Sequence, residues 1–526
     1  MKLKGDLLKT VSGHFALLED DVEIVLQKGK HPRRDELSEF LNKIVLLSEK
    51  LSFKESEIIG KFSPLTFSIS KKNKESSIFF SGIPGGHEFN SFILSILHTG
   101  GHDLKLDKNI ISQVKSVSKN LNFQVFVSLD CQICPDVVQA INKLASVNSN
   151  IKCETLDGGV FQEEVKNKDI QAVPTIFLNG EFFSSGKTNI PKIINKLKDQ
   201  NLIEQKNTIL DKDIKDTVII GGGPAGISSA VYLARKGLNV TLVAETIGGQ
   251  VKETLGIENL ISVIQTTGEK LTSDLHSHLM DYDVQVKDQL LVEKIANGEI
   301  KKVYLSSGEI LQTKTIIIAT GAKWRELNIP GEKENLGKGV AYCPHCDGPF
   351  FKNKEVAVVG GGNSGLEAAL DLSGIVKKVS IVEFMPNLKA DKILVDKAIA
   401  SKNIEIFTNT LTKEVVASNG EVTGLFCEDR DSKNKFKIPL KGIFVQIGLI
   451  PNSKFIKDLV DVTKHGEIII DRNGSTSLEG VFACGDVTTI PYKQIIISMG
   501  EGAKTALGVA DYLMKDFDNL KVKKVI

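Results

Sequence analysis

The chain contains 526 residues, of which 41% are hydrophobic and 25% are charged, and its formal net charge at pH 7 is +1. This length predicts several domains, and the balanced charge excludes the strongly basic surface of a protein that binds nucleic acid. No apolar run approaches the ~18 residues that a membrane helix needs, and the N-terminus lacks the apolar core of a signal peptide. We therefore expect a cytoplasmic protein with no membrane partner.

The seven cysteines are an odd number in a long chain, which argues against a secreted disulfide framework. Cys131 with Cys134, and Cys343 with Cys346, form two Cys-x-x-Cys pairs. Such pairs in a cytosolic protein carry out redox chemistry or bind metal. Because a zinc site needs four ligands and these pairs lie in segments that belong to separate predicted domains, we predict redox pairs and no metal site.

Residues 1–200 alternate strand-like and helix-like segments without a glycine-rich nucleotide loop. A buried strand leads to Cys131 at a helix start, and Val173-Pro174 enters a later strand, an order that resembles the thioredoxin and glutaredoxin fold. An earlier copy without cysteines has Ser63-Pro64 at the matching place, and we interpret it as a structural or docking half. We predict strands at 22–27, 65–70, 76–80, 123–129 and 172–181, and helices at 33–51, 89–100, 136–147 and 191–200.

A polar, charged stretch follows the second copy and predicts a linker over residues 201–213. From Thr217 onward, strand-like and helix-like segments alternate and glycine-rich turns separate them. This alternation is typical of doubly wound parallel sheets.

Two glycine-rich loops each follow a strand and open a helix. The first is Gly221-x-Gly223-x-x-Gly226, with Glu245 at the end of the next strand. Glycines let the backbone approach a pyrophosphate, the helix start binds it, and the acid accepts hydrogen bonds from ribose hydroxyls. The second loop repeats this pattern, so the sequence predicts two dinucleotides, most economically one FAD and one nicotinamide cofactor. The residues of the second loop are Gly360, Gly362, Gly365 and the acid Glu383.

The second cysteine pair lies between the two loops in the segment Cys-Pro-His-Cys-Asp. A thiolate at a helix start is stabilised by the helix dipole, and a second thiol two positions further on can close a disulfide. Asp347, next to Cys346, is a candidate proton donor and acceptor, although an acid at a helix start is also favoured for structural reasons.

Residues 211–526 resemble the low-molecular-weight thioredoxin reductases, which belong to the pyridine nucleotide–disulfide oxidoreductases. The segments that carry the resemblance are GGGPAG, GGQ, IEN, ATGA, CPHCDG, GGGNSG, FACGD and PYKQI. The implied fold is α/β, with tandem thioredoxin-like folds before two doubly wound dinucleotide-binding domains. The implied domains are a thioredoxin-like fold without cysteines at 1–105, a second with the redox pair at 106–200, the linker at 201–213, a discontinuous FAD domain at 214–328 and 448–526, and an NAD domain with the other redox pair at 329–447.

The same resemblance implies the site residues. Cys346 would attack the flavin and Cys343 would exchange with the next disulfide, while Cys131 would attack the partner and Cys134 would resolve it. The first loop would hold FAD and the second the nicotinamide cofactor. The implied FAD contacts are Gly221, Gly223, Gly226, Glu245, Gln250, Asn259, Thr320, Gly321, Asp486, Gln494 and Ile495.

Together with the leading module, the chain resembles the dedicated flavoprotein reductases of 2-Cys peroxiredoxins. The resemblance implies that electrons pass from NADH to FAD, to Cys343–Cys346, to Cys131–Cys134 and to the peroxiredoxin disulfide, which supports peroxide detoxification by a homodimeric enzyme. A general thioredoxin reductase and a hydroperoxide-forming NADH oxidase are the alternatives within the enzyme class. A flavin-binding redox sensor without turnover is the alternative outside it.

Two further expectations concern the nicotinamide cofactor. The residues directly after Glu383 are Phe-Met-Pro-Asn-Leu, with no arginine nearby in the sequence to receive a 2′-phosphate, so we expect NADH to be preferred to NADPH. The cofactor and Cys343–Cys346 belong to one inserted domain and cannot reach the flavin together. We therefore expect a rigid-body rotation about the segments 325–335 and 445–452.

Overall fold

The computed structural model describes residues 5–58, 62–131, 133–170, 173–203, 209–254, 256–418 and 420–523, without the side chains of residues 5–6, 253, 345–346 and 516–523. It divides into two compact units, Met1–Ile209 with Ser306–Glu309, and Leu210–Leu305 with Ile310–Ile526.

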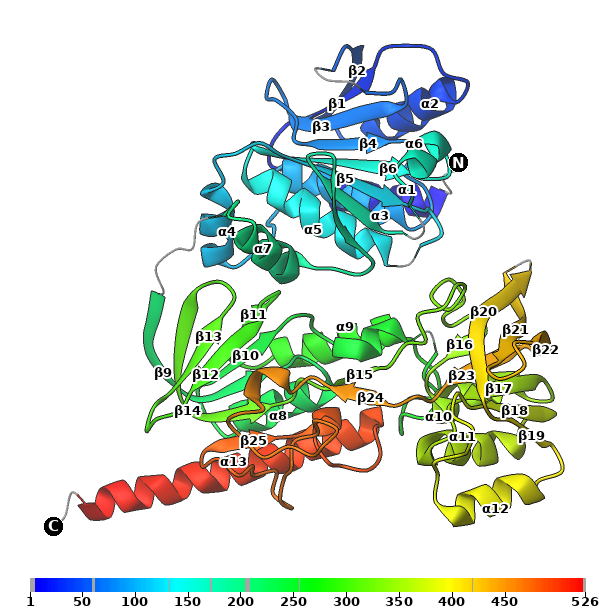
Figure 1. Ribbon diagram of the computed structural model, residues 1–526. Coiled ribbons are helices and arrows are strands. Elements are labelled where there is room, and N and C mark those ends of the chain that lie inside the picture. The colour runs from blue at the N-terminus through cyan, green and yellow to red at the C-terminus, as the bar shows by residue number, and fades with distance from the viewer. Residues whose placement is uncertain are drawn as a thin grey trace. The chain divides into compact units, whose positions relative to one another are not determined.

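The first unit contains one eight-stranded sheet in the order β2-β1-β3-β4-β6-β5-β7-β8 (Figure 1). Each half of this sheet has the same internal order, which is the signature of a repeated fold. The halves join because β4 pairs in parallel with β6, with Ile78 opposite Cys153. The strands are β1 (Val22–Gln27), β2 (Leu51–Ser56), β3 (Thr66–Lys71), β4 (Ile78–Ser81), β5 (Leu121–Val127), β6 (Ile151–Asp157), β7 (Thr175–Leu178) and β8 (Glu181–Ser185).

Helices α3 and α5 hold the two halves together on one side of this sheet. They pack against each other, and the buried Asn142 of α5 donates from Nδ2 to Ser95 Oγ of α3 at 3.0 Å. The two predicted thioredoxin-like folds are therefore present, fused through a shared sheet and a shared helix layer. The helices of this unit are α1 (Gly5–Phe15), α2 (Arg34–Val45), α3 (Glu88–Thr99), α4 (Lys108–Lys115), α5 (Cys134–Val147), α6 (Gln162–Asn167) and α7 (Ile190–Asp199).

The structure differs from the predicted elements at three places. The predicted strand 172–181 ends at Leu178, and a separate strand, β8, begins at Glu181 after a turn at Asn179 and Gly180. The predicted helix 33–51 ends at Val45, and the edge strand β2 begins at Leu51, where only one residue of the strand is fully buried. An edge strand with so little burial has no clear alternation of apolar residues, so the sequence pattern did not predict it. The predicted linker 201–213 ends in strand β9, which begins at Ile209, and residues 204–208 lie outside the described residues.

In the second unit, one sheet follows the order β11-β10-β9-β14-β13-β12, and β25 pairs with β14 (Figure 1). Strands β9, β10 and β11 are parallel, as a doubly wound sheet requires. The elements are β9 (Ile209–Ile220), α8 (Pro224–Ala234), β10 (Val240–Ala244), α9 (Gly268–Met280), β11 (Val284–Asp288), β12 (Val292–Ala296), β13 (Lys301–Leu305), β14 (Glu309–Ile318), β25 (Val481–Ala483) and α13 (Ile495–Lys523).

A second, parallel sheet has the order β16-β23-β17-β18-β19, and a three-stranded sheet β20-β21-β22 accompanies it. The chain connects the mixed sheet that contains β9 to this parallel sheet through β15 (Ala322–Trp324) and β24 (Leu449–Pro451), which pair with each other. The remaining elements are β16 (Val340–Ala341), α10 (Pro344–Asp347), β17 (Glu355–Val359), α11 (Asn363–Ser373), β18 (Lys378–Val382), α12 (Lys392–Ala400), β19 (Ile404–Phe407), β20 (Thr410–Ser418), β21 (Glu421–Asp429), β22 (Lys435–Pro439) and β23 (Gly442–Val445).

Candidate functional site

The first nucleotide loop connects β9 to α8. Gly221 has a φ of +117°, and a Cβ atom there would lie 2.2 Å from the carbonyl oxygen of Ala319. A Cβ atom on Gly226 would lie 1.9 Å from the carbonyl oxygen of Gly221. Gly223 caps α8 with open space around it, so the first N–H groups of the helix are accessible. This cradle fits the pyrophosphate of a dinucleotide, and the half-buried Glu245 follows β10 where a ribose acceptor is needed.

The other residues predicted to contact FAD come from distant parts of the second unit. Asn259 donates from Nδ2 to Gln494 Oε1 at 3.1 Å, directly before Ile495 begins α13. Thr320 donates from Oγ1 to the carbonyl of Asn452 at 2.8 Å, and the adjacent Gly321 has a φ of +67° and open space around its Cα. The structure therefore joins Asn259 to Gln494 through a hydrogen bond. Thr320 and Gly321 directly follow Ala319, whose carbonyl faces Gly221 of the first loop.

Asp486 lies in a short 3₁₀ turn after β25. Its Oδ1 accepts a hydrogen bond from Ser498 Oγ at 3.0 Å, and burial raises the pKa of its carboxyl group. A half-buried carboxylate whose second oxygen remains available is suited to accept a hydroxyl hydrogen bond from a cofactor.

The second loop connects β17 to α11 and repeats the geometry of the first. Gly360 has a φ of +126°, and a Cβ atom on Gly365 would lie 2.0 Å from the carbonyl oxygen of Gly360. Gly362 caps α11 with open space around it. Glu383 accepts hydrogen bonds from the backbone N–H groups of Gly361 at 2.5 Å and Met385 at 2.7 Å, so its carboxylate is fixed at the loop.

A pocket of about 290 Å³ opens beside this loop at the carboxyl ends of the parallel strands. In doubly wound sheets this edge is where nucleotides bind. Gly360, Glu383 and Phe384 line it together with Thr410 and Ile447. The second site thus fits a dinucleotide as well.

Arg430, directly after β21, contacts Phe384, which lines this pocket, although no feature of the sequence predicted an arginine there. Its guanidinium carbon lies 3.9 Å from the ring centroid of Phe384, and its Nη1 donates to the carbonyl of Phe384 at 3.0 Å. Arg430 Nη1 also donates to Asn409 Oδ1 at 3.2 Å. Arg430 lies far along the chain from Phe384, so the sequence carried no signal of this contact, which forms only in the fold.

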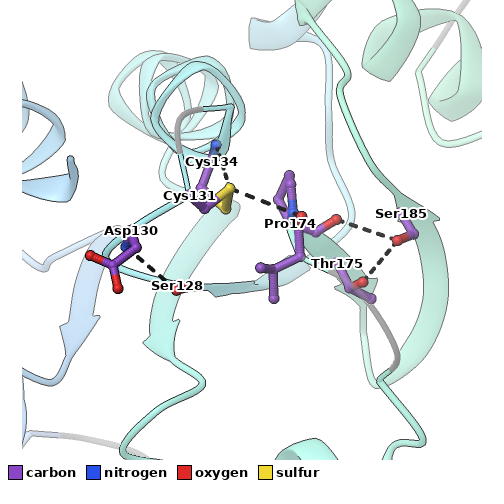
Figure 2. The surroundings of a disulfide bond; sticks show 8 residues. Ser128, Asp130, Cys131, Cys134, Pro174, Thr175 and Ser185 are labelled. Carbon is purple, nitrogen blue, oxygen red and sulfur yellow. Dashed lines mark hydrogen bonds between the residues drawn. A yellow bond between two sulfur atoms is a disulfide. The ribbon is translucent and has the colours of Figure 1, made fainter. Parts of the chain in front are cut away.

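Cys131 and Cys134 form a disulfide at the start of α5, as Figure 2 shows. Cys134 is fully buried, whereas Cys131 is half-buried. The backbone N–H of Cys134 donates to Cys131 Sγ at 3.1 Å, and this sulfur lies 4.0 Å from the carbonyl oxygen of Val173. A donor at a helix start stabilises a thiolate, so this arrangement lowers the energy of the reduced, ionised Cys131.

Glu88, on the first turn of α3, is a second group that could not be picked out from the sequence. Its side chain is 1% exposed, and the adjacent backbone N–H of His87 donates at 3.0 Å to the carbonyl of Leu129, just before Cys131. Burial, reinforced by the charge of Asp136, raises the pKa of Glu88 to about 7. Glu88 lines a small cavity of about 10 Å³, which has room for about one water. The only sequence signal was a single acid in an apolar helix.

The second cysteine pair lies at α10. Cys343 is disulfide-bonded, and the side chain of Cys346 lies outside the described residues, so the pairing of these two remains a prediction. The backbone N–H of Asp347 donates to the carbonyl of Cys343 at 2.9 Å. Burial raises the pKa of Asp347 to about 6. A general acid works best when its pKa lies near the pH of the reaction, so this value suits a proton donor near neutral pH.

The other three cysteines are free and buried, and burial raises the pKa of each thiol, to about 12 for Cys427 and Cys484. A buried thiol with a raised pKa carries little thiolate, which is the reactive form of cysteine. Over the described ranges, no three His, Cys, Asp or Glu side chains are grouped to hold a metal ion. None of the described helices has both the length and the apolar character needed to cross a membrane.

A model of the pyridine nucleotide-disulphide oxidoreductases matches residues 215–507, and a thioredoxin domain model matches residues 121–199. The thioredoxin reductase of Streptococcus pyogenes is 36% identical, with a TM-score of 0.55 over 58% of this chain and 100% of that one. The thioredoxin reductase of Giardia duodenalis is 29% identical, with a TM-score of 0.55 over the same shares. The fold and sites define an FAD- and NAD(P)H-binding disulfide oxidoreductase joined to a thioredoxin domain.

Longer matches come from proteins named as the F subunit of alkyl hydroperoxide reductase. The protein of Staphylococcus aureus MRSA252 is 46% identical over 515 residues, which cover 98% of this chain and 100% of the relative. That of Pseudomonas putida is 45% identical over 516 residues, which cover 98% and 99%. The chain belongs to the pyridine nucleotide-disulphide oxidoreductases and, within them, to the family of the F subunit of alkyl hydroperoxide reductase.

Replacing Gly226 by alanine should remove FAD from the purified protein. The new Cβ would lie 1.9 Å from the backbone carbonyl of Gly221, so the loop must shift out of the shape that receives a pyrophosphate. The ratio of flavin to protein absorbance measures the effect. Gly500→Ala, at a helical glycine with open space around it, should retain its flavin. Full flavin content in Gly226→Ala would show that the loop does not bind FAD.

Replacing Glu88 by glutamine should flatten the pH dependence of stability in the first unit. Because the folded-state pKa lies above the usual 4.5, the stabilisation is complete below about 4.5 and is lost as pH rises through about 7. Amide hydrogen exchange of α3 and β5 at pH 5 and pH 8 measures the loss. The wild type and the surface control Glu163→Gln should lose protection at pH 8, and Glu88→Gln should not. Equal pH dependence in all three would contradict the assignment.

Proposed function

We propose that this protein is an NADH-dependent flavoenzyme that reduces the disulfide of a 2-Cys peroxiredoxin and so supports peroxide detoxification. The observation that carries the proposal is the disulfide of Cys131 and Cys134 at the start of α5, in a chain that also contains two dinucleotide loops. A thioredoxin domain within the chain makes a separate thioredoxin unnecessary as the substrate. The near end-to-end similarity to proteins named as the F subunit of alkyl hydroperoxide reductase supports the same conclusion.

Each of the two glycine-rich loops would bind one of the two cofactors. The loop before α8, with Glu245 and Asp486, would hold FAD, and Gln250, Asn259, Thr320, Gly321, Gln494 and Ile495 complete the proposed contacts. The loop before α11, with Glu383, would hold NADH. Bound flavin supplies the exchange between a hydride donor and a disulfide, which no protein side chain can carry out by itself.

The cysteines would then work in series. Cys343 and Cys346 receive two electrons and two protons, so their S–S bond breaks and two thiols form. Cys343 attacks the disulfide of Cys131 and Cys134, and each exchange breaks one S–S bond and forms another. The half-buried Cys131, with a backbone donor on its sulfur, is suited to attack the partner protein, and the fully buried Cys134 is suited to resolve the mixed disulfide.

Asp347 would supply and accept the proton for the Cys343 pair. Its pKa of about 6 leaves part of the carboxyl protonated near neutral pH. A carboxyl group that is partly protonated and partly ionised can protonate a thiolate as it forms and take the proton back during the reverse exchange.

We also propose the domain boundaries stated above from the sequence, a cytoplasmic location and a homodimer. Helix α13 supports the homodimer, because it packs on α8 and yet leaves Leu507 and Met514 exposed. Large exposed apolar side chains on a long helix are typical of a surface that meets another chain.

Cys131→Ser should abolish peroxiredoxin reduction but leave NADH oxidation by a disulfide dye acceptor, since sulfurs must touch for each exchange. A chain beginning near residue 210 should fail in the same way, and residues 1–200 added at high concentration should restore some activity. Peroxide-dependent NADH consumption measures the result. Cys153→Ala, at a buried free thiol, is the matched control and should retain activity. Reduction of peroxiredoxin by the shortened chain at the full rate would exclude Cys131 from the route.

The wild type should use NADH in preference to NADPH, because the carboxylate of Glu383 accepts from a free 2′-hydroxyl and repels a phosphate. Arg430 is held by the carbonyl of Phe384 and by Asn409, so we expect it to leave this preference in place. Glu383→Gln should lower the ratio of kcat/KM for NADH to that for NADPH by about tenfold or more, the scale of one charge contact. Glu355→Gln, on the surface, should not. Comparable kcat/KM for the two cofactors in the wild type would be the contrary result.

The step that reduces the Cys343 pair should slow as pH rises above about 6, where Asp347 loses its proton. The rate should then fall about tenfold per pH unit, as for any step that needs the protonated form of one group. Asp347→Asn cannot ionise and should show a lower, pH-independent rate in rapid-mixing experiments. A wild-type profile that is flat between pH 5 and 8 would remove Asp347 from this role.

A further inference from the structure

Trp324 is the single tryptophan of the chain, and it ends β15. Its strand pairs with β24, so that Trp324 lies opposite Leu449. These two strands are where the chain crosses between the proposed FAD-binding and NAD-binding parts. A bulky side chain on a connecting strand can influence the relative orientation of the two parts that the strand connects.

The indole of Trp324 stacks on the ring of Tyr342, with ring centroids 6.1 Å apart and an interplanar angle of 11°. Tyr342 immediately precedes the disulfide-bonded Cys343. The stack therefore fixes the residue that carries the backbone into the redox pair. An offset aromatic stack of this kind contributes beyond simple burial.

Tyr342 is also held at its hydroxyl and at its carbonyl. The hydroxyl donates to Glu332 Oε1 at 3.0 Å, and the side chain of Glu332 is 1% exposed. The carbonyl of Tyr342 accepts from Gln446 Nε2 at 2.8 Å. Burial, and next the negative charge of Glu332, raise the pKa of Tyr342, so its hydroxyl stays a donor.

Glu332 anchors this arrangement to the segment that follows Trp324. Its two carboxylate oxygens also accept from the backbone N–H groups of Leu327 at 2.8 Å and Asn328 at 2.7 Å. A buried carboxylate is costly unless several donors satisfy it, and these three hydrogen bonds supply such donors to Glu332.

Trp324 also contacts the loop that follows β10. With the amide of Gln250 oriented to satisfy both of its neighbours, its oxygen accepts from Trp324 Nε1 at 2.7 Å. The nitrogen of the same amide donates to the carbonyl of Ala322 at 2.6 Å. Gln250 follows Gly248 and Gly249 in a short 3₁₀ turn on the proposed flavin side.

We infer that Trp324 is a positioning residue for the Cys343 disulfide, linking it through Tyr342 to the flavin-side loop at Gln250. The inference rests on the proposed function, because it assigns a purpose to the contact only if Cys343 belongs to a redox pair. In the step concerned, the Cys343 disulfide takes two electrons and two protons, its S–S bond breaks, and the flavin is oxidised. Trp324 keeps the segment before Cys343 in register for that step.

The test is anaerobic rapid mixing of the full-length holoenzyme with one equivalent of NADH. Bleaching of the flavin absorbance reports hydride transfer, and its return reports transfer to the Cys343 disulfide. Trp324→Phe retains a ring but loses the N–H donor, and Trp324→Leu loses both. Tyr304→Phe, an aromatic substitution on β13, is the control.

Trp324→Leu should slow the return of the absorbance by about tenfold, the scale of one aromatic contact and one hydrogen bond, while bleaching keeps its wild-type rate. Trp324→Phe should be intermediate, and it decides the matter if Trp324→Leu does not fold. A return at the wild-type rate in both variants, or equal slowing of both phases, would overturn the inference.

Failure of the proposed function gives a different result. In that case the wild-type flavin would bleach without any return, and alkylation would find no new thiol at Cys343. A wild type that forms this thiol, together with Trp324 variants that form it at the same rate, would overturn the role of Trp324 alone.

Discussion

The unpaired N–H groups at the start of a helix are the interaction on which the chemistry of this chain depends. Helix α5 presents such a group to Cys131 Sγ, and α8 and α11 begin at the open glycines Gly223 and Gly362. A thiolate and a pyrophosphate are both anions, and the same partial positive charge stabilises either one. The fold therefore uses one arrangement, a strand followed directly by a helix N-terminus, both for the redox cysteines and for nucleotide binding.

The first unit contains the same fold twice, but only one of the two copies contains a cysteine pair. Both halves have the same strand order, and β4 and β6 fuse them into a single sheet. The cysteine-free half contributes Glu88, which lies beneath the loop before Cys131 and has a raised pKa. The half without cysteines is thus part of the surroundings of the redox pair as well as a support for the sheet.

The sequence was sufficient to predict local geometry that depends on neighbours along the chain. The glycine loops, Glu245, Glu383 and the Cys131 pair follow fixed spacings, and the structure places each loop at the start of its helix. Predictions failed where packing decides the outcome. The strand β2 lies at a sheet edge with little burial, and the linker was predicted to extend into residues that form β9. Glu88, Arg430 and the stack of Trp324 on Tyr342 could not be predicted, because each depends on contacts between residues that are distant in the sequence.

The central claim is that electrons reach the partner only after passing from the Cys343 pair to the Cys131 pair. The most direct measurement is rapid quenching of the full-length enzyme with an alkylating reagent after one equivalent of NADH, followed by mapping of the labelled cysteines. The account predicts that label appears first on Cys343 and Cys346 and then moves to Cys131 and Cys134 as the first pair is reoxidised. Label that reaches Cys131 before Cys343, or that never leaves Cys343 and Cys346, would contradict it.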